Sequence, residues 1–276
     1  MKSEALLSCA VLAAFAATPA AAGCADASDA ACEIEGGSYH IALPADASGP
    51  LPAVLFLHGW GSSGGNAIGN GSISPPILER GYAFIAPDGV PRSNGNGRTW
   101  SFHPDWPEAR DEVAFLEGVI ADAVEKHGVD PEQVILSGFS IGGSMTAYAA
   151  CVSPEAFDAY APLGGNFWRP HPETCEGPVR LLHTHGWTDT TVPLEGRYLR
   201  DGQIAQGDVF AAFEIWRDTN GCDAMRADSF EISAEYWRRV WERCSDGAAL
   251  ELALFPGGHI VPAGWSDLVL DWYEGL

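Results

Sequence analysis

Short apolar runs alternate with amphipathic segments along most of the chain. Seven runs have the length and content of β-strands, namely residues 39–43, 53–57, 83–86, 133–137, 159–163, 179–183 and 249–255. Several are continuously apolar, which is typical of strands buried on both faces of a sheet. Helical segments fall between them. This alternation predicts an α/β fold with a mostly parallel central sheet flanked by helices, in a single domain.

The clearest helix is expected over residues 111–127, whose apolar positions recur at helical spacing. Asp111 can cap its N-terminus, and Gly128 can end it. Residues 91–107 are instead rich in Gly, Asn and Trp and are expected to form a long loop. Loops of this length in compact domains are often functional.

The composition describes a folded and strongly acidic protein. The chain has 276 residues, of which 46% are hydrophobic and 11% aromatic, so it can bury a sizeable core. It carries 15 Lys and Arg against 37 Asp and Glu, a formal net charge of −22. Such a surface repels phosphate backbones and anionic lipids. We therefore expect neither nucleic-acid nor membrane binding.

The amino terminus has the layout of a secretory signal peptide. The apolar run 6–17 is too short to span a membrane, which takes about 20 residues. Lys2 precedes this run, and an Ala-x-Ala site ends at Ala22. We expect residues 1–22 to be removed, leaving residues 23–276 as one exported catalytic domain, extracellular or periplasmic. A buried helix and a lipoprotein signal ending at Cys24 are the weaker alternatives.

Cysteine usage agrees with export. Cys9 lies in the expected signal peptide, and six cysteines remain. An even number in an exported chain predicts disulfides, with buried free thiols as the alternative. Proximity along the chain favours the pairs Cys24–Cys32, Cys151–Cys175 and Cys222–Cys244. No C-x-x-C pair occurs, so a structural zinc site has no support.

The segment Gly138-Phe139-Ser140-Ile141-Gly142 follows the strand expected at 133–137 and precedes a run with good helix-forming content, 145–150. A G-x-S-x-G sequence between a strand and a helix predicts a nucleophile elbow, a sharp turn that exposes the serine hydroxyl. The alternative is an ordinary Gly/Ser turn. We take Ser140 as the candidate nucleophile.

A nucleophilic serine needs a base and an acidic residue that orients the base. In chains with a nucleophile elbow, the acidic residue follows the serine in sequence and the base follows the acidic residue. His259 comes directly after the last expected strand, behind two glycines. Asp189 comes shortly after the strand expected at 179–183, at the sheet edge where α/β sites form. We expect Ser140 to attack an ester carbonyl, His259 to transfer the proton and Asp189 to orient the imidazole. The weaker acid candidates are Asp218, Asp223 and Asp228.

Two backbone N–H groups are expected to stabilise the developing oxyanion, those of Ile141 and Trp60. His58 lies next to Trp60 in sequence and is expected to brace that loop rather than to act as a base. Three tryptophans are expected in loops near the site, where they could stack on an acyl group or a sugar or pack in the core: Trp100, Trp168 and Trp187.

Together these motifs resemble the α/β-hydrolase fold and, more narrowly, the secreted esterase family of feruloyl esterases and poly(3-hydroxybutyrate) depolymerases. The matching segments are Leu57-His58-Gly59-Trp60-Gly61, Ala86-Pro87-Asp88-Gly89, Asp111-Glu112-Val113-Ala114-Phe115, Gly138-Phe139-Ser140-Ile141-Gly142-Gly143, His185-Gly186-Trp187-Thr188-Asp189 with Val192-Pro193, and Gly257-Gly258-His259. The resemblance implies hydrolysis of carboxylic esters through an acyl-enzyme, with no cofactor. The family also tends to carry cysteines near Cys151, Cys175, Cys222 and Cys244.

Two other functions compete with this hypothesis. A metal-dependent hydrolase could use His183 and His185, whose H-x-H spacing suits zinc, with Asp189 nearby. A third histidine at suitable spacing is missing, and we expect no metal. A non-catalytic binding protein on a hydrolase scaffold would be favoured if a triad member were absent, and none is.

The expected substrate is a small or oligomeric ester, because the chain ends at Leu276 without the linker and polymer-binding domain usual in depolymerases of solid polyester. The negative net charge favours a neutral ester over a polyanionic one. No heptad pattern predicts self-association.

Overall fold

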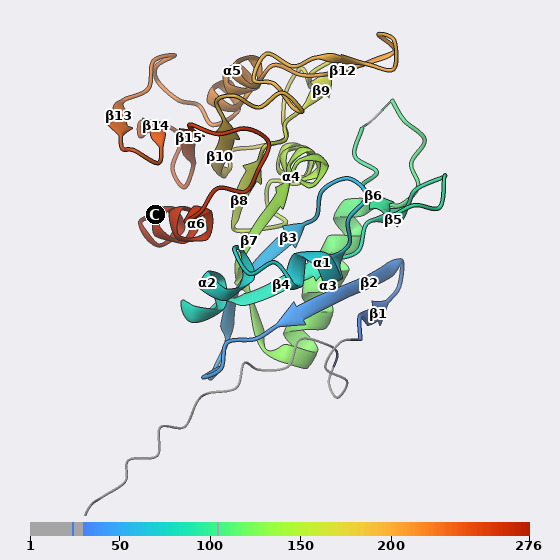
Figure 1. Ribbon diagram of the computed structural model, residues 1–276. Coiled ribbons are helices and arrows are strands. Elements are labelled where there is room, and N and C mark those ends of the chain that lie inside the picture. Colours follow the sequence, from blue (N-terminus) through green and yellow to red (C-terminus); the bar gives the residue numbers. More distant parts are fainter. Residues whose placement is uncertain (1–23, 25–29, 104) are drawn as a thin grey trace, which may run out of the picture.

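A ten-stranded sheet runs through the middle of the protein in this computed structural model, which describes Cys24, residues 30–103 and residues 105–276 (Figure 1). The expected signal peptide and the cleavage site after Ala22 lie outside the described residues. In spatial order the strands are β1 (Cys32–Ile34), β2 (Gly37–Ala42), β4 (Ala83–Pro87), β3 (Leu51–Leu57), β7 (Val129–Phe139), β8 (Ala159–Leu163), β10 (Arg180–Gly186), β15 (Ala249–Phe255), β14 (Trp237–Trp241) and β13 (Ser229–Ile232).

The six central strands, from β4 to β15, are parallel, and the strands at both edges are antiparallel. Each of the seven runs expected as strands lies in this sheet. The carboxyl ends of the parallel strands meet at one edge. That edge is where open α/β sheets place their sites.

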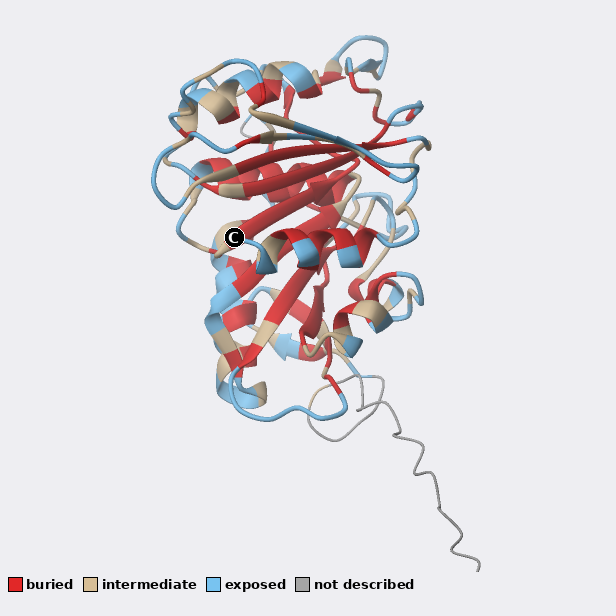
Figure 2. Cartoon of the chain, turned by 90° about the vertical axis from the view of Figure 1, so that its left-hand side faces the viewer, coloured by how far each residue is buried: buried red, intermediate tan, exposed pale blue. Residues whose placement is uncertain are grey.

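Helices cover both faces of the sheet. Those of one face are α3 (Glu112–His127), α4 (Ile141–Val152) and α5 (Val209–Thr219), and those of the other are α1 (Gly64–Ile68), α2 (Ser74–Glu79) and α6 (Trp265–Glu274). Successive strand residues point to opposite faces, so Leu55 packs in one apolar cluster and its neighbours Val54 and Phe56 in the other. Figure 2 shows the strands buried and the outer helix faces exposed. The α/β prediction is confirmed.

The helix expected at 111–127 is α3, and its ends have the expected physical causes. The Asp111 side chain accepts a hydrogen bond from the Ala114 N–H at 3.1 Å. Gly128 ends the helix with φ at 71°, a left-handed conformation that glycine adopts without steric cost. Glu112 in the first turn and Lys126 in the last turn also complement the helix dipole.

The structure departs from the sequence expectations at several elements. Strand β10 continues three residues past 183, to Gly186, and carries His185 within the sheet. The expected loop 91–107 contains part of a small hairpin of β5 (Val90–Pro91) and β6 (Arg98–Thr99). A separate small sheet joins β9 (Trp168–Arg169), β12 (Ile204–Gln206) and β11 (Tyr198–Leu199), near α5 in Figure 1. These short strands carry no periodic pattern that sequence reasoning can detect.

Strands β13 and β14 were missed because charges interrupt their apolar content. Arg238 of β14 forms ion pairs with Glu231 of β13, at 2.8 Å, and with Glu251 of β15. Glu251 is buried, and its carboxylate is satisfied by that cross-strand guanidinium. Cross-strand pairing therefore allows charged residues to enter the antiparallel edge of the sheet.

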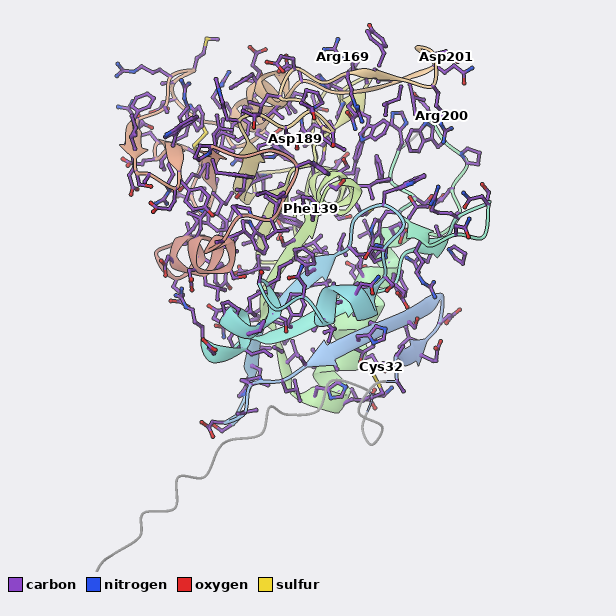
Figure 3. The ribbon with its side chains drawn as sticks, in the orientation of Figure 1. Cys32, Phe139, Arg169, Asp189, Arg200 and Asp201 are labelled. Atoms are coloured by element: carbon purple, nitrogen blue, oxygen red, sulfur yellow. A yellow bond between two sulfur atoms is a disulfide. The ribbon has the colours of Figure 1, made fainter. Side chains whose placement is uncertain are left out.

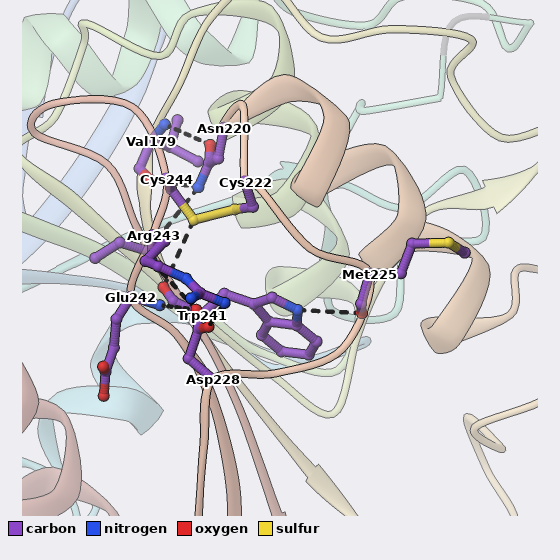
Figure 4. Close-up of a disulfide and its surroundings, with 10 residues drawn as sticks. Val179, Asn220, Cys222, Met225, Asp228, Trp241, Glu242, Arg243 and Cys244 are labelled. Atoms are coloured by element: carbon purple, nitrogen blue, oxygen red, sulfur yellow. Dashed lines mark hydrogen bonds and ion pairs between the residues drawn. A yellow bond between two sulfur atoms is a disulfide. The ribbon is translucent and has the colours of Figure 1, made fainter.

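Three disulfides join Cys24 to Cys32, Cys151 to Cys175 and Cys222 to Cys244, the pairs that proximity along the chain favours. Next to the third bridge, the Asn220 amide donates to the carbonyl of Val179 and accepts from its N–H, each at 2.9 Å (Figure 4). The amide holds the end of α5 against the start of β10, and the bridge joins the segment after α5 to the segment after β14. Among the described residues, none of the helices combines the length and apolar content needed to cross a membrane.

Candidate active site

Ser140 lies in a strained turn between β7 and α4. Its φ and ψ are 61° and −120°, and a positive φ is rare in any residue but glycine. The Ser140 N–H donates to the Leu163 carbonyl at 2.9 Å, which ties the turn to the end of β8. Strained non-glycine residues of this kind cluster at functional sites. The turn directs the hydroxyl into a cavity at the carboxyl edge of the sheet.

The glycines around Ser140 are required by close backbone contacts. A Cβ on Gly142 would lie 2.1 Å from the Leu57 carbonyl oxygen, and a Cβ on Gly138 would lie 2.5 Å from the Gly142 oxygen. A Cβ on Gly165, after β8, would lie 1.9 Å from the Ser140 oxygen. No larger residue fits between these backbones. The G-x-S-x-G pattern thus records how tightly β3, β7 and α4 approach at the turn.

A continuous hydrogen-bond chain joins the three residues that the sequence singled out. His259 Nε2 lies 2.9 Å from the Ser140 Oγ, and His259 Nδ1 lies 2.7 Å from the Asp189 Oδ2. The ionised carboxylate can only accept, so Nδ1 carries a proton and Nε2 can accept the serine proton. Figure 3 labels Asp189 and Phe139, the residue before Ser140. The Phe139 ring packs against His259, with centroids 4.7 Å apart.

Asp189 is held as an ionised acceptor. Burial alone would raise its pKa, but hydrogen bonds from His259 and from the Val192 and Thr191 N–H groups outweigh burial, so its pKa lies below the usual value. Both backbone donors reach Oδ1 at 2.8 Å, which leaves Oδ2 for the imidazole. The carboxylate therefore has a fixed orientation and keeps its charge at neutral pH.

His183 and His185 form a stacked pair in the core beneath Asp189. The His183 Nε2 lies 3.0 Å from the His185 Nδ1, and the His185 Nε2 donates to the Val192 carbonyl at 2.7 Å. Burial lowers the pKa of both rings, so they are neutral. His185 thereby uses both of its nitrogens in hydrogen bonds to protein groups. Its role in this arrangement is to hold the Val192 loop that orients Asp189, and a metal would have to break these contacts.

The loop after β3 supplies the second expected oxyanion donor. Within the described part of the chain, neither the Trp60 N–H nor the Ile141 N–H donates to a protein acceptor, whereas the next N–H in the loop, that of Gly61, donates to Arg98. Trp60 and Ile141 line the same cavity as Ser140. Both residues expected to supply oxyanion donors thus border the cavity that holds Ser140, with N–H groups that no acceptor in the described residues occupies.

His58 braces this loop. Its Nδ1 donates to the Gly59 carbonyl at 2.8 Å, and its Nε2 accepts from the Gly89 N–H at 3.1 Å. Burial lowers the pKa of His58, which keeps one ring nitrogen available as an acceptor. The Trp100 indole N–H donates to the His58 carbonyl at 2.9 Å. These contacts agree with a structural role for His58 and leave none for it as a base.

The cavity above Ser140 has a volume of about 650 Å³ and a mostly apolar lining. Four tryptophans contribute to it: Trp60, Trp100, Trp106 and Trp168. Trp187, which was expected at the site, is half-exposed and packs instead on Trp237, with ring centroids 5.6 Å apart. Sequence reasoning missed Trp106, although it lies in the segment 91–107 whose length suggested a function. It also missed Arg197, Arg200 and Gln206, which line the same cavity.

Comparison with known proteins agrees with this geometry. The model of the phospholipase/carboxylesterase family of α/β-hydrolases matches residues 40–204, more than half of the chain. The chain belongs to this family. Its members share the strand–serine–helix turn found here at Ser140. The fold and the family expected from the sequence are thus confirmed.

Named relatives are esterases. The chain is 26% identical over 240 residues to a probable feruloyl esterase C of Aspergillus niger, covering 82% of this chain and 77% of the relative. It is 28% identical over 176 residues to feruloyl esterase C of Emericella nidulans, covering 59% of each chain. The solved acetyl xylan esterase of Aspergillus awamori shares the fold, with a TM-score of 0.67 at 17% identity over 87% of this chain and 95% of that one. The protein is a serine carboxylic ester hydrolase.

Proposed function

We propose that this protein is an exported esterase in which Ser140, His259 and Asp189 cleave esters of aromatic acids of the feruloyl type. The observation that supports the proposal is the hydrogen-bond chain from Asp189 to Ser140, which ends in a cavity lined by four indoles. A flat aromatic acyl group suits such a lining because stacked or edge-on rings add to the burial of apolar area. The relatives named as feruloyl esterases support the same acid.

The reaction proceeds through an acyl-enzyme. The Ser140 oxygen attacks the ester carbonyl carbon while its proton passes to His259 Nε2. The carbonyl oxygen becomes an oxyanion that accepts from the Ile141 and Trp60 N–H groups. The carbon–oxygen bond to the alcohol then breaks, and the leaving alkoxide takes the proton from His259. Water repeats the sequence on the Ser140 ester and releases the acid, while Asp189 stabilises the imidazolium in both steps.

Export is proposed from the three disulfides and the amino-terminal sequence. Disulfides persist in oxidising compartments and are rare in the cytosol. We propose that residues 1–22 direct the chain across a membrane and are removed after Ala22, leaving residues 23–276. Amino-terminal sequencing of the protein recovered from the medium or periplasm should read from Gly23. A mature chain that begins at Met1 would contradict this.

Replacing the nucleophile is the decisive test of the mechanism. Ser140→Ala should lower kcat on p-nitrophenyl acetate by roughly 10³-fold or more, because no oxygen remains to form the acyl-enzyme. Ser144→Ala is the matched control: Ser144 lines the same cavity and accepts a hydrogen bond from the Trp168 indole. The control should retain kcat within severalfold. Activity retained by Ser140→Ala would refute the mechanism.

A panel of ester substrates tests which carboxylic acid forms the acyl part of the substrate. We expect kcat/KM for methyl ferulate to exceed that for 3-hydroxybutyrate oligomers and for acetylated xylan, since only the feruloyl group fills an indole-lined cavity. A preference for 3-hydroxybutyrate oligomers would contradict the proposed feruloyl substrate and favour a depolymerase-like activity. It would not contradict the proposed roles of Ser140 and His259.

A further inference from the structure

The charge on the cavity wall is opposite to the charge of the whole protein. The chain has 37 acidic and 15 basic side chains, yet the described residues that line the cavity include Arg197 and Arg200 and no Asp or Glu. Acidic neighbours in sequence, Glu195 and Asp201, do not contribute to the lining. The lining of the cavity that holds Ser140 therefore carries local positive charge.

Arg197 is oriented by a buried partner. Its Nε donates to the Gln206 Oε1 at 3.1 Å, and Gln206 is only 6% exposed. The Gln206 N–H donates to the Arg197 carbonyl at 2.9 Å, which fixes the two residues across the hairpin. The contact through Nε leaves both terminal nitrogens of the guanidinium for another acceptor. These two nitrogens form the fork that pairs with a carboxylate.

Neither cavity arginine has an acidic partner within the part of the chain that the structure describes. Of the other eleven arginines, six form ion pairs: Arg80, Arg98, Arg110, Arg180, Arg238 and Arg243. The remaining five form none among the described residues, but they do not line this cavity: Arg92, Arg169, Arg217, Arg226 and Arg239. In so acidic a chain, carboxylates are plentiful. Two guanidinium groups without one, on the wall of one cavity, are available to a ligand.

Arg200 lies at a strained position. It occupies the tip of the hairpin between β11 and β12, where Arg200 and Asp201 have φ of 49° and 55° (Figure 3). Glycine adopts this conformation freely and Asn or Asp does so locally, but arginine is disfavoured there. Consecutive residues with positive φ are typical of tight hairpin turns, so this turn carries Arg200 to the cavity lining at some cost in backbone strain.

We propose that Arg197 and Arg200 bind a carboxylate carried by the ester substrate, so that the enzyme prefers monoanionic esters to neutral ones of the same shape. The inference rests on the proposed esterase function and adds the charge of its substrate. It replaces the neutral-ester preference expected from the net charge. Distant surface charges are screened over about 8 Å at physiological salt, whereas a direct guanidinium–carboxylate pair is screened much less.

Matched ester pairs test the proposal. On the acyl side the pair is mono-p-nitrophenyl glutarate and p-nitrophenyl valerate, which have the same chain length and differ in one terminal carboxylate. On the alcohol side the pair is 4-acetoxybenzoate and phenyl acetate. The measured quantity is the ratio of kcat/KM between the anionic and the neutral member. In the double variant Arg197→Gln, Arg200→Gln this ratio should fall about tenfold for the pair whose carboxylate reaches the arginines.

Arg169→Gln is the matched control, since Arg169 is an exposed arginine at the end of β9 that does not line the cavity. It should leave both ratios unchanged. Raising the salt concentration should reduce the wild-type ratio and should barely affect the ratio of the double variant.

Ratios that stay unchanged in the double variant for both pairs would overturn the proposal while leaving the esterase function standing. Failure of the wild-type protein to hydrolyse any of the four esters or methyl ferulate would instead overturn the esterase function. A fall confined to the glutarate pair would assign the carboxylate to the acid, and a fall confined to the benzoate pair would assign it to the alcohol.

Discussion

The floor of the cavity and its rim hold their side chains in different ways. The floor consists of Ser140, which lines the cavity, of His259 and Asp189, which are joined to it by contacts of 2.9 Å or less, and of the glycines around Ser140. All three side chains follow parallel strands of the sheet. Backbone carbonyls close the space around the floor glycines. The rim is built from loops and strands of two or three residues, and its Trp60, Arg197 and Arg200 are exposed.

The difference suggests that the tightly packed floor determines the rate of the reaction and that the exposed rim determines which substrate binds. Displacing a reacting group by about 1 Å costs about a hundredfold in rate, so the floor can change little without losing catalysis. We expect a rim side chain to contact only the remote part of an ester, so its replacement should alter which ester binds. Many proteins with different functions share this fold, so the function depends on the residues of the site. We expect the rim residues to determine the substrate specificity.

The largest effect is expected from overfilling the floor. Gly142→Ala places a Cβ 2.1 Å from the Leu57 carbonyl oxygen, and neither backbone can move without displacing Ser140. We expect a loss of about 3 kcal/mol or more in the free energy of unfolding. The folded fraction should also lose about a hundredfold in kcat/KM. Urea unfolding and p-nitrophenyl acetate kinetics measure the two effects.

Gly71→Ala is the matched control for that substitution. Gly71 is exposed, and a Cβ there would meet no atom within 4 Å. Its stability and activity should match those of the wild type within about 0.5 kcal/mol. If the two alanine variants have equal stability and activity, the floor tolerates an added methyl group. The proposed difference in packing between floor and rim would then be wrong.

Buried histidines beside the floor should make stability depend on pH, and His127 and His171 elsewhere act in the same direction because burial lowers the pKa of both. Burial lowers the pKa of His58, His183 and His185 below the ordinary 6.5. As the pH falls below 6.5, the histidines bind protons in the unfolded chain but not in the folded core. The free energy of unfolding therefore decreases as the pH falls. Urea unfolding at pH 7 and pH 5.5 should differ by about 2 to 4 kcal/mol. Burial raises the pKa of Glu112, so this carboxyl acts in the opposite direction and favours the folded state as the pH falls.

The rim provides the contrasting measurement. Guanidinium groups do not titrate in this range. The anionic-to-neutral activity ratio should therefore be constant between pH 7 and pH 5.5. A flat stability profile would contradict neutral histidines in the core. A ratio that changes with pH would point to a titrating group in substrate binding and would make the rim resemble the floor.

The sequence was informative about the floor because local constraints determine it. Continuous apolar runs identify central parallel strands, and the glycines beside Ser140 are required by backbone contacts that any elbow shares. Asp189 and His259 follow such strands by a few residues, so their placement at the same sheet edge follows from chain order. Ser140, Asp189 and His259 come from segments that are distant in sequence. Each of them can nevertheless be identified from the residues next to it in the chain.

The rim could not be read in the same way. The strands that carry Arg197 and Gln206 are too short for a periodic pattern, and their contact depends on a hairpin whose tip is a strained Arg-Asp pair rather than a turn-forming Asn-Gly. Trp187 and Trp106 look alike in sequence, since both occupy loops near the site. Only the packing of Trp187 on Trp237 distinguishes them.

The smallest effect is expected from that tryptophan pair. Trp106 lines the cavity and packs edge-on against Trp168 at 5.3 Å between centroids, so Trp106→Ala should lower kcat/KM for methyl ferulate by about tenfold. The same change should affect p-nitrophenyl acetate less, because an acetyl group fills little of the cavity. Trp187→Ala removes an equal ring outside the cavity and should leave the ferulate-to-acetate ratio unchanged. If both variants lower that ratio equally, aromatic selectivity does not reside in the rim, and the loss must come from a shift of the floor shared by the two loops.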